Sequence, residues 1–166
     1  MGDSVDDIKF DSDLLATKFL INPEVFNEMS PTIPSGFPIN LLPNEKCENE
    51  MTQLLDCMFD NKFDNVECQM YQKNYYSCKK WRDSLIFKRI KDWEIELFEF
   101  MSSNEKKIYL ESMEQKKNGL IDKYEKLPVL PKTRGHRLRI ASDIEQIDWR
   151  IKYCNNLSNI KNTIRI

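Results

Sequence analysis

Four cysteines in one short segment constrain the fold of this chain more than any other feature. Cys47 and Cys57 have nine residues between them, and so do Cys68 and Cys78. On an α-helix ten residues rise about 15 Å, so the two sulfurs of a pair lie too far apart to bind one metal ion. If two such helices pack antiparallel, Cys57 lies opposite Cys68 and Cys47 lies opposite Cys78, and the equal spacing keeps both contacts in register. The alternative is four unrelated, reduced core cysteines.

The residues around these cysteines favour two short helices. Apolar side chains recur every three or four residues in both segments, and Asp and Asn supply turn chemistry between them. The first stripe contains Met51, Leu54, Leu55 and Met58, the second contains Tyr71 and Tyr75, and the turn contains Asp60, Asn61, Asp64 and Asn65. A helical pair this short buries little apolar surface. Crosslinks would therefore dominate its stability, at roughly 3 kcal/mol for each disulfide.

The spacing C-x9-C…C-x9-C, within residues 44–82, resembles the twin CX9C, or coiled-coil-helix-coiled-coil-helix (CHCH), family of mitochondrial intermembrane-space proteins. The resemblance implies a helical hairpin with Cys47–Cys78 and Cys57–Cys68 disulfides. It also implies import without a presequence, trapping by the disulfide relay oxidoreductase of that compartment, and a mostly non-catalytic role. The aromatic residues that flank Cys68 and Cys78 leave open which of the two docks on the relay.

The charge is distributed unevenly, although the net charge of the 166 residues is only −2. Residues 1–30 carry seven acidic residues against two lysines, and residues 132–166 carry eight Lys or Arg against three acidic residues. The acidic start argues against a matrix presequence, which is Arg-rich, and against a secretory signal. No run reaches the roughly 18 to 20 apolar residues that a membrane span needs. The presence of only four glycines favours helices over a strand-rich fold.

The segments on either side of the cysteines predict an arm and a helical extension. Residues 1–43 form an arm that is first acidic and then, over residues 30–43, uncharged with four prolines. This second part must be extended or irregular and should lie along a surface. In residues 83–127, helical spacing continues the second helix to about residue 101, although the run WEIELFEF also fits a strand. Ser102 or Ser103 then caps a helix that ends at Leu127 and Pro128.

Residues 128–166 predict a basic linker followed by a final helix. Ser142 and Glu145 fit a capping box at the start of that helix. An apolar seam follows at intervals of three and four residues, and it should pack on the long helix near residues 93–101 or on a neighbouring subunit. The predicted partner-binding residues are Ile144, Ile147, Ile151, Trp93 and Phe98. Cys154 also lies on the seam and should be a buried, reduced thiol.

The chain offers no recognisable catalytic set. Its one histidine, His136, lies in the basic linker, and there is no glycine-rich phosphate loop. We therefore expect no enzymatic activity, no catalytic residue, no cofactor, no metal site and no small-molecule substrate. Copper-carrying members of the resembled family usually have an additional adjacent thiol pair, which this chain lacks. The basic residues of the linker either face solvent or a protein partner, or they contact anionic lipid or RNA; they are Lys132, Arg134, Arg137 and Arg139.

The sequence patterns predict an all-α protein, and the resemblance to the CHCH family implies a location in the mitochondrial intermembrane space, peripheral to the inner membrane. The expected architecture is a disulfide-stapled antiparallel helical hairpin with an N-terminal extended arm and additional C-terminal helices. The expected role is that of a structural, accessory subunit of a respiratory-chain or ATP-synthase complex. Two alternatives are a soluble assembly factor of the cytochrome c oxidase type and a mitochondrial ribosomal subunit.

Overall fold

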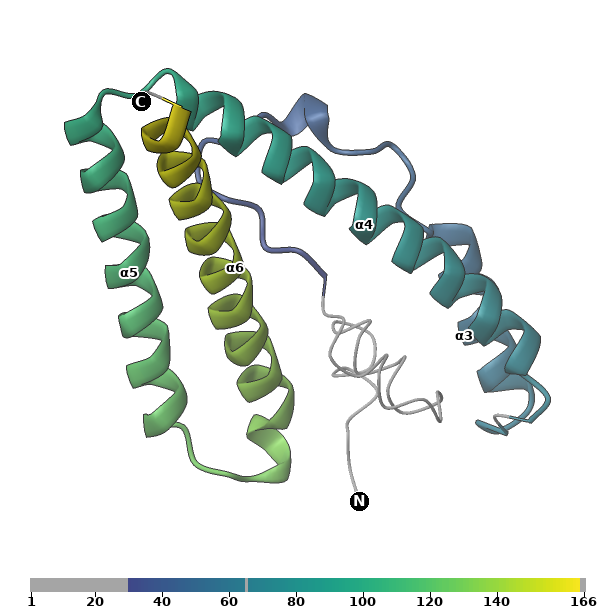
Figure 1. Ribbon diagram of the computed structural model, residues 1–166. Coiled ribbons are helices and arrows are strands. Elements are labelled where there is room, and N and C mark those ends of the chain that lie inside the picture. The colour runs from purple at the N-terminus through teal and green to yellow at the C-terminus, as the bar shows by residue number, and fades with distance from the viewer. Residues whose placement is uncertain (1–29, 65, 165–166) are drawn as a thin grey trace. The chain divides into compact units, whose positions relative to one another are not determined.

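A computed structural model describes residues 30–64 and 66–164, and within these ranges the chain is helical with no strand (Figure 1). The sequence of residues 11–29 also fits one or two short helices, but these residues lie outside the described ranges. The helices are η2 (Ile39–Leu41), α3 (Glu48–Asp60), α4 (Gln69–Glu99), α5 (Ser103–Lys126), η3 (Pro131–Thr133) and α6 (Arg134–Ile164). The chain divides into two compact units between Ile90 and Lys91, within α4. We describe the unit before this boundary as the N-terminal unit and the unit after it as the C-terminal unit.

In the N-terminal unit, α3 and the first part of α4 run in opposite directions and are joined by disulfides near both ends of α3 (Figure 1). The turn between them begins with a Schellman motif. The Phe63 N–H donates to the Met58 carbonyl at 2.6 Å, and the Lys62 N–H donates to the Phe59 carbonyl at 3.4 Å. Lys62 and Phe63 both have positive φ, at 53° and 64°. The reversal therefore uses left-handed residues where glycine is the usual choice.

Residues 30–43 lie along α4, as their prolines and apolar residues predicted. Phe37 is buried, and the Leu41 carbonyl accepts a hydrogen bond from Arg89 Nη1 at 2.7 Å. The Ser30 hydroxyl donates to Asp83, a buried carboxylate that also pairs with Lys79 at 2.9 Å. Polar contacts at both ends thus hold this segment, in which one short turn of 3-10 helix, η2, is the only regular element.

In the C-terminal unit, α5 and α6 pack side by side and antiparallel (Figure 1). The α5 helix begins after Ser102, one of the two predicted caps. The structure adds a capping box, in which the Ser102 hydroxyl accepts from the Glu105 N–H and the Glu105 carboxylate accepts from the Ser102 N–H. It ends at Lys126, directly before Leu127 and Pro128, as expected. The α4 helix is continuous to Glu99, so the strand alternative for this stretch is wrong.

The predicted start of the final helix is also wrong. The α6 helix begins at Arg134 and not near Ser142, which lies buried inside it and accepts a hydrogen bond from Gln146 Nε2 at 2.9 Å. The reason is tertiary. Arg137 donates to the Tyr124 and Leu127 carbonyls at 3.2 and 2.7 Å, and so caps the end of α5 from the first turn of α6. Much of the predicted basic linker is therefore helical.

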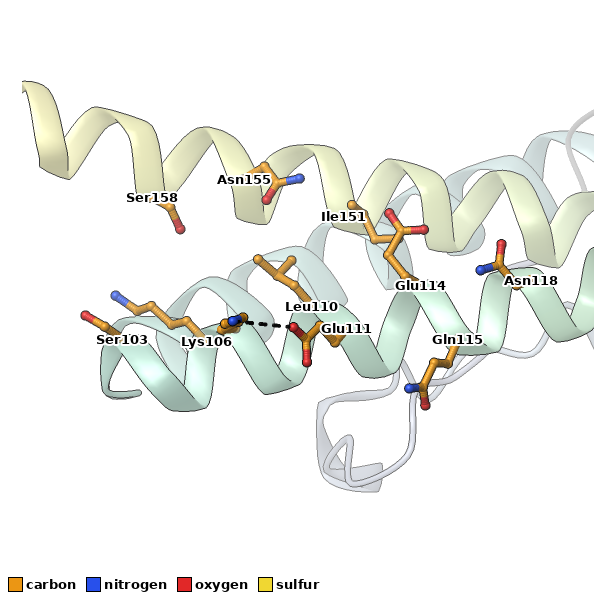
Figure 2. Close-up of a pocket in the computed structure, with 11 residues that line it drawn as sticks. Ser103, Lys106, Leu110, Glu111, Glu114, Gln115, Asn118, Ile151, Asn155 and Ser158 are labelled. Carbon is orange, nitrogen blue, oxygen red and sulfur yellow. Dashed lines mark ion pairs between the residues drawn. The ribbon is translucent and has the colours of Figure 1, made fainter.

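An open groove of about 730 Å³ runs between α5 and α6 (Figure 2). Leu110 and Ile151 lie between the helices, and charged and amide side chains such as Lys106, Glu114 and Asn155 line the edges. None of the helices in the described ranges is long and apolar enough to cross a membrane.

Candidate functional site

The cysteine pairing predicted from the spacing is confirmed. Cys47 is bonded to Cys78 and Cys57 to Cys68, with Cα–Cα distances of 6.0 and 5.9 Å. The Cys57–Cys68 bridge closes the turn between the helices. The Cys47–Cys78 bridge joins the residue before α3 to Cys78 within α4. The smaller covalent loop lies within the larger one. The two bridges thus tie α3 to α4 at two points, which are about ten residues apart along each of the two helical segments.

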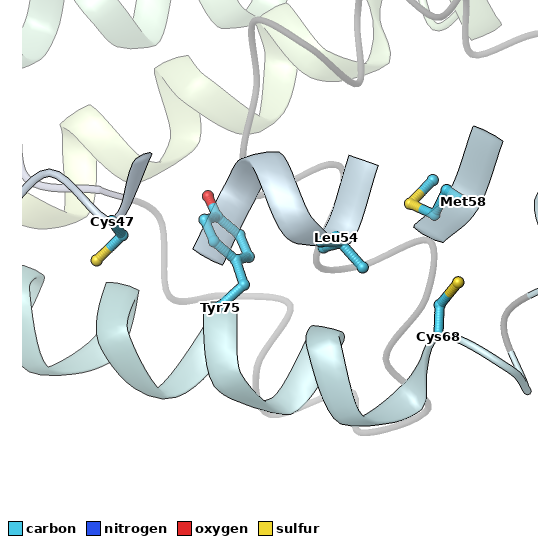
Figure 3. Close-up of a cluster of buried hydrophobic side chains, with 5 residues drawn as sticks. All are labelled: Cys47, Leu54, Met58, Cys68 and Tyr75. Carbon is cyan, nitrogen blue, oxygen red and sulfur yellow. The ribbon is translucent and has the colours of Figure 1, made fainter. Parts of the chain in front are cut away.

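A small apolar cluster fills the space between the two bridges (Figure 3). Leu54 and Met58 point from α3 toward α4, and Tyr75 points back from α4. All three are buried, as are Cys47 and Cys68. Four partly buried residues complete the packing: Met51, Cys57, Tyr71 and Cys78. Because so few side chains are enclosed, the disulfides must carry much of the stability of this unit.

Two carboxylates lie beside the Cys47–Cys78 bridge. One ligand atom from each of Glu45, Glu50, Cys47 and Cys78 falls within 4.8 Å of the others. The Glu45 carboxylate accepts a hydrogen bond from the Cys47 N–H at 2.7 Å, which fixes it at the start of α3. Both sulfurs are engaged in the disulfide, and a disulfide sulfur is not the thiolate that binds a transition metal. In the oxidised chain this group therefore amounts to two carboxylates, of which Glu45 is exposed and Glu50 is half-buried.

The predicted seam on α6 lies partly inside the C-terminal unit. Ile151 and Cys154 are buried with Phe98 of α4 and Met113 of α5, and Ile147 packs against this cluster. The remaining two predicted partner-binding residues, Ile144 and Trp93, are half-buried and do not belong to it. The structure thus brings together Phe98, Ile147 and Ile151, and both α4 and α5 contribute residues that pack against this side of α6.

A buried carboxylate lies next to this cluster, and the sequence analysis did not identify it. Glu94 on α4 has no exposed surface. Arg150 of α6 forms a two-pronged ion pair with it, with its Nε 3.0 and 3.1 Å from the two carboxylate oxygens. The hydroxyls of Tyr109 and Tyr153 donate to the same carboxylate, one to each oxygen. Three helices, α4, α5 and α6, therefore each contribute at least one member to the Glu94 network.

One sequence signal pointed to this residue. Ile90, Glu94 and Phe98 follow one another at intervals of four on α4, and all three are buried. A charged residue between two core positions of a helix requires a partner when it is buried. The sequence shows this requirement, but it does not show which of the many Lys and Arg residues meets it.

The network shifts the ionisation of its members in favour of the ion pair. Burial raises the pKa of Glu94, but the hydrogen bonds and charge of Arg150, with those of the two tyrosine hydroxyls, outweigh burial and hold that pKa below its ordinary value. Burial and the nearby carboxylate raise the pKa of Tyr109 and of Tyr153. Glu94 is thus charged and both tyrosines are neutral donors at neutral pH.

Cys154 is a free and buried thiol, as predicted. Burial, with the Glu94 charge, raises its pKa to about 12. The thiolate is the reactive form, so this side chain is a core residue at neutral pH and has no nucleophilic character.

A second ion-pair group joins α5 to α6 at the surface. Asp148 lies 2.8 Å from Lys117 across the helices and 2.7 Å from Lys152 on its own helix. Hydrogen bonds from these two lysines lower the pKa of Asp148 to about 2. The pair between Lys117 and Asp148 joins the two helices near the surface, where an ion pair contributes little energy.

The four basic residues predicted to contact lipid or RNA lie at the junction of α5 and α6. Lys132 is in η3, and Arg134, Arg137 and Arg139 are in the first turns of α6. Arg137 caps α5 and stacks over the Tyr124 ring at 4.2 Å, and Arg139 pairs with Asp143 at 3.0 Å. Lys132 and Arg134 are exposed.

Comparisons with protein family models, with curated proteins and with solved structures found no match to this chain.

Proposed function

We propose that this chain is a CHCH-type protein of the mitochondrial intermembrane space and a non-catalytic, structural subunit of an inner-membrane respiratory-chain or ATP-synthase complex. The observation that carries the proposal is the pair of nested disulfides. They join the members of two C-x9-C pairs across two antiparallel helices, which is the arrangement that the family resemblance implied. Disulfides of this kind persist in oxidising compartments and are rare in the cytosol.

Exposed apolar side chains support a role as a subunit. In the last turns of α4, Glu94 and Phe98 face the core, whereas Leu97 is 36% exposed. Phe100, directly after the end of the helix at Glu99, is 85% exposed. In the N-terminal unit, Trp81 is 56% exposed. Large exposed aromatic residues are typical of protein interfaces, where they bury much area at little entropic cost.

The test of assembly is the migration of the tagged full-length chain on a native gel of mitochondria. A structural subunit should co-migrate with a large inner-membrane complex, whose other proteins can then be identified by mass spectrometry. A chain that migrates only as a small soluble species would contradict the proposal and favour the assembly-factor alternative.

A double substitution sharpens this test. Leu97→Ser with Phe100→Ser should release the chain from the complex without unfolding it, because both side chains are exposed. Glu96→Ser is the matched control, since Glu96 is an exposed residue of the same helix. If the double variant stays assembled, the exposed side chains of Leu97 and Phe100 do not form the interface.

Import can be tested separately. Deletion of residues 2–20 should leave the chain in the intermembrane space, because an acidic segment does not act as a presequence. Replacement of Cys68 and Cys78 by serine should abolish accumulation there, since neither disulfide can then form. The opposite pair of results would refute trapping by disulfide formation.

A further inference from the structure

The connection between α5 and α6 lies at one end of this helical pair (Figure 1). Apolar side chains of this connection are exposed to solvent. Val129 is 82% exposed and Leu130 is 43% exposed. Pro128 and Pro131, on either side of them, are also exposed. A surface loop is usually polar, so two adjacent aliphatic residues between two prolines require an explanation.

Hydrogen bonds hold this loop in one shape. The Thr133 hydroxyl donates to the Pro128 carbonyl at 2.6 Å and accepts from the Leu130 N–H at 3.2 Å. The Thr133 N–H donates to the Leu130 carbonyl at 3.1 Å. Because hydrogen bonds fix the backbone on both sides of Val129 and Leu130, the loop holds these two side chains in their exposed positions.

The surroundings of the loop are strongly basic. Residues 122–139 carry six Lys or Arg against two acidic residues, a local charge of +4 in a chain whose net charge is −2. The 31-residue helix α6 begins at Arg134, so the positive end of its helix dipole lies at the same place. One of these positive charges is paired within the segment, because Lys126 lies 2.8 Å from Asp122. The net charge of residues 122–139 is still positive.

A pocket of about 350 Å³ lies directly behind the loop. Val129, Leu130 and Leu138 are among the apolar residues that line it, and Arg134 and Arg137 line it as well. An apolar wall beside two arginines suits a molecule with a hydrocarbon part and an anionic head.

We propose that Val129, Leu130, Lys132 and Arg134 form a docking surface for a bilayer that contains anionic phospholipid. In interfacial membrane anchors, aliphatic residues enter the headgroup region and the basic residues around them bind lipid phosphate. A nucleic acid fits this surface less well. Single-stranded RNA is held by stacking on accessible rings, and the one aromatic ring that lines the pocket, Tyr124, is covered by Arg137. The inference needs no part of the proposed function, because the purified chain and lipid vesicles are sufficient to test it.

The experiment is flotation of the purified, oxidised full-length chain with vesicles of phosphatidylcholine alone or with added phosphatidylglycerol. The chain should float with the anionic vesicles and remain unbound with the neutral ones, and added salt should weaken the binding. Val129→Ser with Leu130→Ser should reduce the bound fraction at least several-fold, by removing the inserted surface. Lys132→Glu with Arg134→Glu should reduce it by roughly tenfold or more, since each basic residue near an anionic surface is worth about five-fold in binding.

Matched controls come from the far end of α5. Ile108→Ser removes an apolar residue that is 57% exposed, and Lys107→Glu reverses an exposed charge, both outside the loop. These two variants should bind vesicles as the unchanged chain does, and circular dichroism should show all variants equally helical.

Three results would overturn the proposal: no binding to anionic vesicles, equal binding to neutral vesicles, or loop variants that bind as well as the controls. A parallel arm uses single-stranded RNA of mixed sequence. Binding to RNA without binding to vesicles would reassign the surface to a nucleic acid.

Discussion

Residues 30–90 and residues 91–164 each pack helices around a cluster of five buried apolar residues, but they hold those helices together by different means. In the N-terminal unit two disulfides tie α3 to α4. In the C-terminal unit the cysteine in the cluster, Cys154, is a free thiol, and a buried ion pair with two tyrosine hydroxyls joins α4, α5 and α6. The first means depends on redox conditions and the second on protonation.

The difference follows from the length of the partners. The α3 helix has 13 residues and buries only Leu54 and Met58, so packing alone cannot offset its loss of conformational entropy. The α5 and α6 helices have 24 and 31 residues and pack along much of their length. A short helix needs a covalent constraint, whereas long helices can tolerate a buried charge if it is fully paired.

Reduction should have the largest effect, and it should fall on one unit. Each disulfide is worth about 3 kcal/mol in the chain-entropy model, and a small five-residue core leaves little surplus stability to offset the loss of both. We expect reductant to unfold α3 and the start of α4, as seen by rapid amide hydrogen exchange, while α5 and α6 stay protected. Equal loss of protection in both units would show that the C-terminal unit depends on the disulfides.

Replacement of Arg150 should have the next largest effect, and it should fall on the other unit. Arg150→Met leaves Glu94 buried without its counter-ion, which typically costs about 3–5 kcal/mol. The measurement is chemical denaturation with the disulfides intact. The double variant with Glu94→Met should lose less than Arg150→Met alone, since no charge is then left unpaired.

An exposed ion pair provides the control for the Arg150 variant. Lys126→Met breaks the Lys126–Asp122 pair on the surface of α5, and stability should hardly change. A loss as large as that of Arg150→Met would mean that burial is not what makes the Glu94 pair important.

Acid should weaken the C-terminal unit by a smaller amount. The folded state holds the pKa of Glu94 below its ordinary value, so folding favours the charged carboxylate. Its contribution is fully present above the ordinary pKa of about 4.3 and is lost as the pH falls from there through the lower folded value. Denaturation midpoints for α5 and α6 should therefore decline over that range, and Glu94→Gln should remove this part of the decline. A variant with the same acid profile as the unchanged chain would contradict this assignment.

Two serines should show the smallest effects and separate a true helix cap from an apparent one. Ser102→Ala removes the hydroxyl that accepts from the Glu105 N–H and should cost about 1 kcal/mol. Ser142 lies inside α6, where alanine is the better helix former. Ser142→Ala should therefore reduce the stability less than Ser102→Ala does. Thermal unfolding of both variants makes the comparison. A larger loss at Ser142 would mean that its bond with Gln146 is more important than helix propensity.

Local patterns in the sequence determined much of this protein. The ten-residue intervals between cysteines predicted both bridges, and the serine pair Ser102 and Ser103 predicted where α5 starts. These features depend on residues that are near neighbours in the chain, or on a register that repeats at equal intervals. The physical rules that connect such spacing to helix geometry are local, so the sequence is sufficient to apply them.

Tertiary structure alone decided the start of α6 and the partners of Glu94. The capping box at Ser142 met the local rule, yet the helix extends back to Arg134, where Arg137 binds the last carbonyls of α5. Arg150 and Tyr153 lie 56 and 59 residues from Glu94 in sequence, and they meet it only because three helices pack together. A buried charge is costly unless it is paired, so Glu94 requires a partner wherever the helix places it. Which of the 25 Lys and Arg residues becomes that partner is decided by how the three helices pack.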